Sequence, residues 1–205
     1  MLGTFSFVPG GLFGLTPEEK QFHFIGLGSG GTNVIQHIQK KGIEGDFSCM
    51  SWFPSFVEPY KGINHIFYEY PREIRNATML GRQRQPLTAE IKATLLKDQF
   101  YVVFCGLGGF TGTSLISDVL EFLETNCIKH IAVCTLPDKG EGRFRNDYAL
   151  SKQIELGKYK NVFYYNHHTT IRKYGDLPVS KAFACADEEL FRIFQTHAVK
   201  LTTAS

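Results

Sequence analysis

A buried strand followed by a glycine-rich turn and a helix constrains this chain more than any other feature. Residues 100–105 form an apolar run long enough for a buried strand, and residues 115–123 have the apolar spacing of an amphipathic helix. The residues between them, 106–114, read GLGGFTGTS. Backbone N–H groups at a helix start favour an anion such as phosphate, and glycines let the backbone approach it closely. The residues expected to contact a phosphorylated ligand are Gly106, Gly108, Gly109, Phe110, Thr111, Gly112 and Thr113.

A second glycine-rich turn, at residues 26–33 (GLGSGGTN), also joins a predicted strand to a predicted helix. Gly26, Gly28 and Gly31 satisfy the dinucleotide pattern G-x-G-x-x-G, which is a weak signal by itself. A dinucleotide site needs an acid at the end of the next strand, 47–53, and none stands there. A P-loop is excluded because a threonine occupies the place of the required lysine. Ligand contacts are expected from Gly26, Gly28, Ser29, Gly30, Gly31 and Asn33.

The apolar patterns alternate between strand and helix along the chain. This alternation predicts an α/β fold, a doubly wound parallel sheet with helices on both faces, and ligands at the carboxyl ends of its strands. Residues 1–20 are expected to form an N-terminal arm, with a short helix at 16–19, and residues 21–205 a single domain. The predicted strands are 21–27, 47–53, 63–70, 100–105, 129–135 and 161–165, and the predicted helices are 32–41, 87–97, 115–123, 145–156 and 180–200.

Composition excludes several classes of protein. The 205 residues carry a net charge of +2 and contain no run of five basic residues, which argues against a nucleic-acid binder. No apolar run approaches the roughly 18 residues that a membrane span requires. The five cysteines form no C-x-x-C pair, so we expect a reduced, cytoplasmic protein. No metal site is expected: His167 and His168 are adjacent on a segment predicted to be extended, where neighbouring side chains point apart.

The two turns together resemble the tubulin and FtsZ family, which surrounds a nucleoside triphosphate with two such loops. Residues 106–114 resemble its signature G-G-G-T-G-T-G, with Phe110 at the third position and Ser114 at the last. Residues 26–33 resemble the FtsZ form G-x-G-G-x-G-G-N, and Asn33 matches its asparagine. The resemblance extends over about residues 22–190 and implies a GTP-binding domain with GTP or GDP as its ligand, and with Mg²⁺ as an open question.

The same resemblance implies the roles of five further residues. Glu141 and Arg145 match the segment in which a glutamate accepts from ribose hydroxyls and an arginine lies near ribose and phosphate. Asn166 matches the asparagine that contacts guanine, Phe183 the aromatic that stacks on the base, and Asp187 the acid that recognises it. Phe183 and Asp187 are one helical turn apart, so both can face one ligand. A carboxylate accepts from guanine N1–H and its amino group, which would select GTP over ATP.

Two parts of the family pattern are altered. The family's glycine-alanine loop over the γ-phosphate is replaced by residues 81–86, where Arg82 and Arg84 either clamp the phosphate or belong to a plain surface loop. The family's N-T-D segment is missing after the second strand.

The family completes GTP hydrolysis with an acidic loop after its central helix, and no acid follows Glu189 here, so we expect weak hydrolysis or none. The final helix is expected to leave an apolar stripe uncovered for self-association or a protein partner; the stripe comprises Phe183, Ala186, Leu190, Phe194 and Ala198.

Four functions remain open from the sequence. The first is a GTP-binding, nucleotide-dependent interaction or assembly module. The second is a polymer-forming cytoskeletal GTPase. The third is an NAD-dependent oxidoreductase, which would use the first glycine turn, and the fourth is a scaffold that binds no nucleotide.

Overall fold

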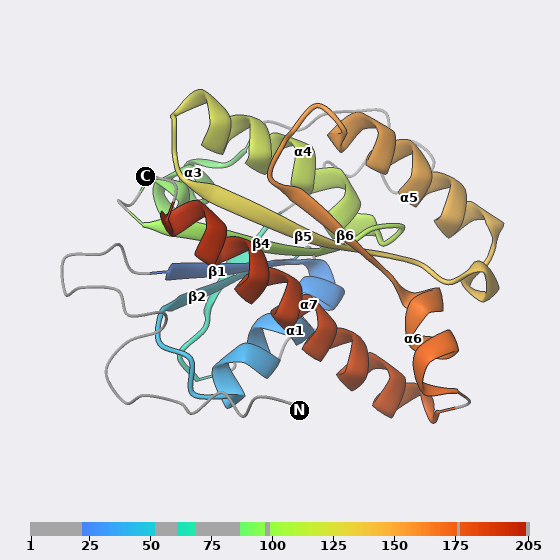
Figure 1. Cartoon of the computed structure of the whole chain (residues 1–205). Helices are drawn as coiled ribbons and strands as arrows, with labels where there is room; N and C mark the ends of the chain where they lie inside the picture. The colour runs from blue at the N-terminus through green and yellow to red at the C-terminus, as the bar shows by residue number, and fades with distance from the viewer. Residues whose placement is uncertain (1–21, 52–60, 69–86, 97–98, 176, 204–205) are drawn as a thin grey trace.

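A computed structural model describes residues 22–51, 61–68, 87–96, 99–175 and 177–203. The expected N-terminal arm with its short helix, and the two arginines of the 81–86 loop, lie outside the described residues. Six strands form one parallel sheet in the order β3-β2-β1-β4-β5-β6 (Figure 1). They are β1 (Phe22–Leu27), β2 (Asp46–Ser51), β3 (Asn64–Phe67), β4 (Phe100–Gly106), β5 (His130–Leu136) and β6 (Val162–Asn166).

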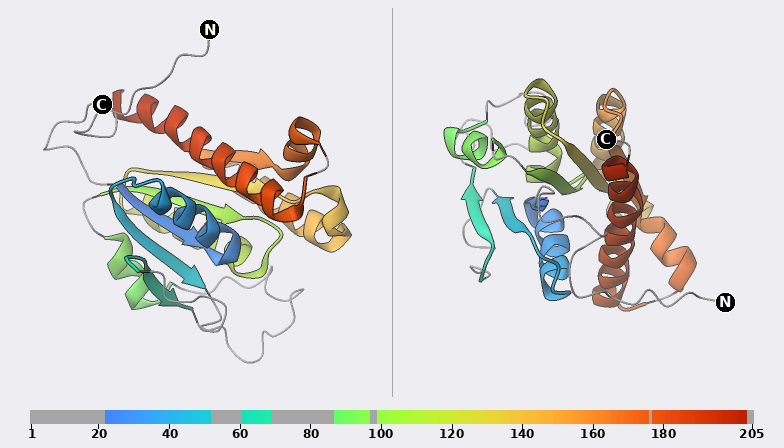
Figure 2. Two further views of the ribbon diagram at one scale, coloured as in Figure 1. Left: turned by 90° about the horizontal axis from the view of Figure 1, so that it is seen from below. Right: turned by 60° about the vertical axis from the view of Figure 1, so that its left-hand side comes forward.

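Helices cover both faces of the sheet, as Figures 1 and 2 show. Helices α1 (Gly28–Lys40) and α7 (Val179–Thr203) pack on one face, and α3 (Ala89–Leu95), α4 (Phe110–Thr125) and α5 (Arg143–Leu156) pack on the other. A short turn of 3-10 helix, η3 (Lys139–Glu141), precedes α5, and α6 (His167–Tyr174) follows β6. The predicted doubly wound α/β architecture is therefore confirmed.

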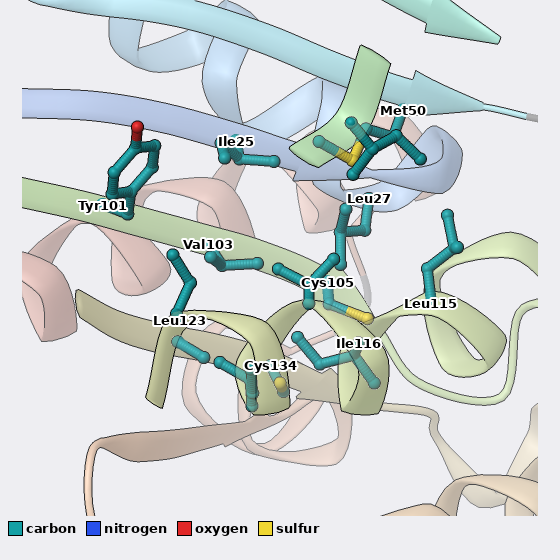
Figure 3. Close-up of a cluster of buried hydrophobic side chains, with 14 of the residues drawn as sticks. Ile25, Leu27, Met50, Tyr101, Val103, Cys105, Leu115, Ile116, Leu123 and Cys134 are labelled. Atoms are coloured by element: carbon teal, nitrogen blue, oxygen red, sulfur yellow. The ribbon is translucent and has the colours of Figure 1, made fainter. Parts of the chain in front are cut away.

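Alternate residues of each central strand face opposite cores, because side chains point to alternating sides of a sheet. On β4, Val102 and Phe104 pack toward α1 and α7, whereas Tyr101 and Val103 pack toward α3 and α4. Figure 3 shows the core on the α3 and α4 side of the sheet, in which Ile116 of α4 lies among the strand residues. Both faces of the sheet are dry, so its strands read as continuous apolar runs.

Helix α6 was not predicted. His167 and His168 were expected on an extended segment, but α6 begins at His167. The Asn166 side chain accepts a hydrogen bond from the His168 backbone N–H at 2.8 Å, which satisfies one of the free N–H groups of the first turn. Asparagine is a favoured N-cap residue, and this local signal was present in the sequence.

The expectation of an uncovered apolar stripe on α7 is wrong. Ala186, Leu190 and Phe194 are only 2%, 1% and 0% exposed because they pack on the sheet. The Phe194 ring meets the ring of Phe22 edge-on, with centroids 5.4 Å apart. Phe183 alone among the described side chains of the stripe is exposed, at 47%, and the side chain of Ala198 lies outside the described part.

Candidate functional site

Two helix N-termini lie together at the carboxyl ends of the central strands of the sheet. The strand order reverses between β1 and β4, because the chain continues toward β2 on one side and toward β5 on the other. Open α/β sheets bind ligands in the crevice at such a switch point. Helix α1 begins directly after β1, α4 begins at Phe110 shortly after β4, and neither has an acidic residue in its first turn. The two positive helix ends therefore face the same crevice with no local carboxylate to offset them.

The two glycine turns contact each other through backbone atoms. A Cβ placed on Gly28 would lie 3.1 Å from the Gly112 nitrogen, and one placed on Gly30 would lie 3.5 Å from the Gly106 Cα. Gly28 has a φ of +68°, a conformation that residues with a side chain rarely adopt. The absence of side chains thus brings the two turns together into one surface of N–H groups.

Four of the expected ligand residues are packed away from the cavity described below and do not line it: three glycines that allow close backbone approach, and one buried threonine. A Cβ on Gly31 would lie 2.2 Å from the Phe104 carbonyl oxygen, and one on Gly26 would lie 2.6 Å from the Gly31 carbonyl carbon, so both allow α1 to approach the sheet. A Cβ on Gly108 would lie 2.7 Å from the Arg145 carbonyl oxygen, so this glycine admits the start of α5. Thr113 is fully buried, and its hydroxyl has no partner among the described residues.

A cavity of about 380 Å³ opens at this crevice. This volume lies within the range of small-molecule sites. Its lining includes most of the expected residues, namely Gly28, Ser29, Gly30, Asn33, Gly106, Gly109, Phe110, Thr111, Gly112, Glu141, Arg145 and Phe183. Sequence reasoning missed five lining residues: Leu27, Leu107, Thr135, Pro137 and His167. Thr135 and Pro137 lie a few residues before Glu141, in the same family-like segment. Their closeness to Glu141 in the sequence was therefore a signal that could have identified them.

Glu141 is held firmly at one side of the cavity. One carboxylate oxygen accepts from the Asp138 backbone N–H at 2.8 Å, as part of a capping box at η3. The other oxygen lies 2.9 Å from a guanidinium nitrogen of Arg145, one helical turn away. The Arg145 side chain is half exposed, so the pair presents one acceptor group and one cation to the cavity.

Asn166 and Asp187 do not line the cavity. The Asn166 side chain caps α6. Asp187 lies one turn beyond Phe183 on α7, and burial raises its pKa to about 6, while the nearby His37 opposes that rise. Asp187 is therefore a carboxylate near the base-stacking candidate that loses its charge more readily than an exposed aspartate.

A second cavity of about 330 Å³ adjoins the first and shares Glu141, His167 and Phe183 with it. It is otherwise lined by residues of η3, α6, the start of α7 and the connections beside them, among them Leu177, Ala182 and Ala186. His167 and Phe183 thus border both cavities.

The described residues offer little for a metal ion. No group of three or more His, Cys, Asp or Glu side chains in this part of the chain could hold one. Glu141 is the one carboxylate that lines the cavity among the described residues, and Arg145 already neutralises it. Among the described residues of the lining, Glu141 is therefore the one carboxylate that a Mg²⁺ ion could use. Within the described ranges, no helix has both the length and the hydropathy for a membrane crossing.

The sequence is similar to those of several FtsZ proteins. It is 28% identical to cell division protein FtsZ 1 of Archaeoglobus fulgidus over 183 residues, which cover 82% of this chain and 48% of the relative. It is 32% identical to FtsZ of Buchnera aphidicola over 146 residues, or 66% of this chain and 37% of that protein. The chain therefore spans about half the length or less of these curated relatives. No protein-family model matches the sequence.

Solved structures share the fold. An empty FtsZ dimer from M. jannaschii superimposes with a TM-score of 0.72 at 22% identity, over 86% of this chain and 54% of the other. CetZ2 from Haloferax volcanii, a GTPγS-bound protofilament, superimposes with a TM-score of 0.66 at 14% identity, over 87% and 58%. Sequence and fold agree with the resemblance seen in the two glycine turns: the chain belongs to the tubulin/FtsZ-like family, and its described part has the fold of that family's nucleotide-binding domain.

Proposed function

We propose that this chain binds GTP or GDP in the cavity between α1 and α4. The supporting observation is that the two glycine turns contact each other at the switch point of the sheet and line one cavity. The exposed ring of Phe183 also lines this cavity. The phosphates would lie on the N–H groups of the two helix starts. The ribose would lie beside Glu141 and Arg145, and the base would stack on Phe183.

Base selection falls to Asp187, which is one helical turn from Phe183. Its carboxylate can accept two hydrogen bonds from the N1–H and 2-amino groups of guanine. Adenine lacks this pair of donors. Neither Asp187 nor Asn166 lines the cavity, so the Asp187 side chain would have to turn toward the base, and the Asn166 amide, whose oxygen caps α6, would contact it from the end of β6.

We infer that hydrolysis by the chain alone is weak or absent. Phosphoryl transfer to water needs a group that orients the nucleophile and cations that offset the developing charge. Glu141 is tied to Arg145 on the ribose side, so the described lining offers no carboxylate at the phosphate end. A residue outside the described part of the chain, or a neighbouring molecule, would have to supply that group.

Assembly is the cellular use that we propose for the bound nucleotide. The matched solved structures include a CetZ2 protofilament and a PhuZ filament. We infer a nucleotide-dependent interaction or assembly module, and a polymer-forming GTPase is the second candidate. Light scattering with GTP, with GDP and without nucleotide would separate these two functions, because only the second predicts filaments that appear with GTP.

The primary test is to denature the purified protein and to identify any released nucleotide by chromatography. We expect GDP or GTP. Titration calorimetry of stripped protein with GDP, ATP and NAD should then show binding of GDP alone, and Asp187→Asn should weaken it. Leu150→Ala is a matched control, because Leu150 is an exposed residue of α5 outside the cavity lining. Preference for NAD, or a stripped protein that ignores GDP, would refute the proposal.

A further inference from the structure

His167 borders the proposed nucleotide site from the first position of α6. Its ring packs edge-on against Phe183, with centroids 5.6 Å apart and planes at 74°. Its side chain is only 20% exposed. The ring is therefore held in place between the proposed base-stacking residue and the cavity.

The distance between His167 and Glu141 is the second observation. The Nδ1 atom of His167 lies 3.6 Å from an oxygen of Glu141. This separation exceeds the usual hydrogen-bond range of about 2.7–3.2 Å. One hydroxyl oxygen can stand about 2.8 Å from both atoms, accepting from Nδ1–H and donating to the carboxylate.

The protonation states suit this arrangement. Burial lowers the pKa of His167, which favours the neutral ring, although Glu141 opposes the shift. A neutral ring carries its hydrogen on one nitrogen, and a proton on Nδ1 avoids placing a lone pair against the carboxylate. The same Glu141 oxygen accepts from the Asp138 N–H and keeps capacity for one more donor.

We propose that His167 and Glu141 together recognise one ribose hydroxyl, so that His167 determines selectivity for ribonucleotides over deoxyribonucleotides. The inference rests on the proposed guanine-nucleotide function and assigns a ligand contact to a residue that the sequence analysis considered only as a metal ligand. His168 differs in both respects: its Nδ1 atom is hydrogen-bonded to an Asp138 carboxylate oxygen at 3.0 Å, and it does not line the cavity.

The test compares GDP, 2′-deoxy-GDP and 3′-deoxy-GDP by calorimetry. One net hydrogen bond is worth about fivefold in affinity and the hydroxyl makes two, so the wild type should bind one of the two deoxy compounds about 25-fold more weakly than GDP. His167→Phe keeps an aromatic ring against Phe183 but removes the N–H. It should lower GDP affinity about fivefold, leave that deoxy compound unaffected, and reduce their ratio to about fivefold, because the hydrogen bond to Glu141 remains. His168→Phe should keep the wild-type ratio.

Two outcomes would overturn the inference and can be told apart. If the wild type binds GDP but the ratio is the same in His167→Phe, or both ligands weaken equally, then His167 has only a packing role and the proposed function stands. If the wild type binds no guanine nucleotide, then the proposed function fails and this inference fails with it.

Discussion

Replacing Gly31 by alanine should strongly destabilise the protein, whereas the same change at Gly30 should not. A Cβ on Gly31 would lie 2.2 Å from the Phe104 carbonyl oxygen. Cβ atoms in proteins essentially never come within 3.0 Å of an atom that is not close to them along the chain. Helix α1 would have to move by about 0.8 Å (3.0 minus 2.2) away from a central strand. At Gly30 the nearest contact would be an ordinary 3.5 Å.

The magnitudes follow from the rigidity of the neighbours. Overpacking typically costs about 1–3 kcal/mol, and a backbone carbonyl of a central strand cannot rotate away, so we expect about 3 kcal/mol for Gly31→Ala. Gly30→Ala should stabilise α1 by up to about 1 kcal/mol, because alanine favours a helix over glycine. Out of a total of about 5–15 kcal/mol, this difference is easily measured.

Urea unfolding followed by circular dichroism measures both variants. Gly31→Ala should unfold at a much lower urea concentration than the wild type, with the slope unchanged. A midpoint for Gly31→Ala equal to that of Gly30→Ala would refute the packing argument. Gly31→Ala should also lose GDP binding, because movement of α1 separates the two glycine turns.

Further predictions concern α7. Phe194→Ala should lower the free energy of unfolding by about 3–5 kcal/mol, because it empties a fully buried site on the sheet. Phe183→Ala should lower it by under about 1 kcal/mol and should instead weaken GDP binding. Equal losses of stability in urea unfolding of the two variants would contradict this prediction. GDP affinity should fall as the pH drops through about 6, since the raised pKa of Asp187 protonates the carboxylate needed for guanine, and Asp187→Asn should show a flat profile in calorimetry. Because burial penalises the charged form of Asp187, Asp187→Asn should stabilise the ligand-free protein at pH 8 but not at pH 4, where the native carboxyl is already neutral; thermal unfolding at both pH values checks the sign.

Local patterns were sufficient for most elements. The predicted strand 21–27 corresponds to β1, and the predicted helix 145–156 corresponds to α5 within two residues. These predictions succeed because apolar periodicity and glycine turns act over a few neighbouring residues. Helix α6 was missed because its start depends on one side-chain cap, Asn166, that is easily read as the end of a strand.

The candidate site could be predicted only in part. The glycine turns came from sequence patterns, and Glu141, Arg145 and Phe183 came from the family resemblance. Glu141, Arg145, Phe183 and residues of both turns line one cavity. His167 could not be found in this way, because its role depends on distances to Glu141 and Phe183, which are 26 and 16 residues away in the chain. The division of the glycines between ligand contact and helix packing also required coordinates, since a pattern of glycines is the same in both cases.

The sequence by itself determined the parallel α/β architecture, the two glycine-rich turns and the resemblance to the tubulin/FtsZ family. Only the tertiary structure decided the order of the strands, which brings β1 and β4 together and so places both turns at one crevice. It also decided that Ala186, Leu190 and Phe194 of the α7 stripe are buried on the sheet. The physical reason is that hydrophobic periodicity shows which face of an element avoids water, whereas the surface that covers this face comes from residues far away in the chain.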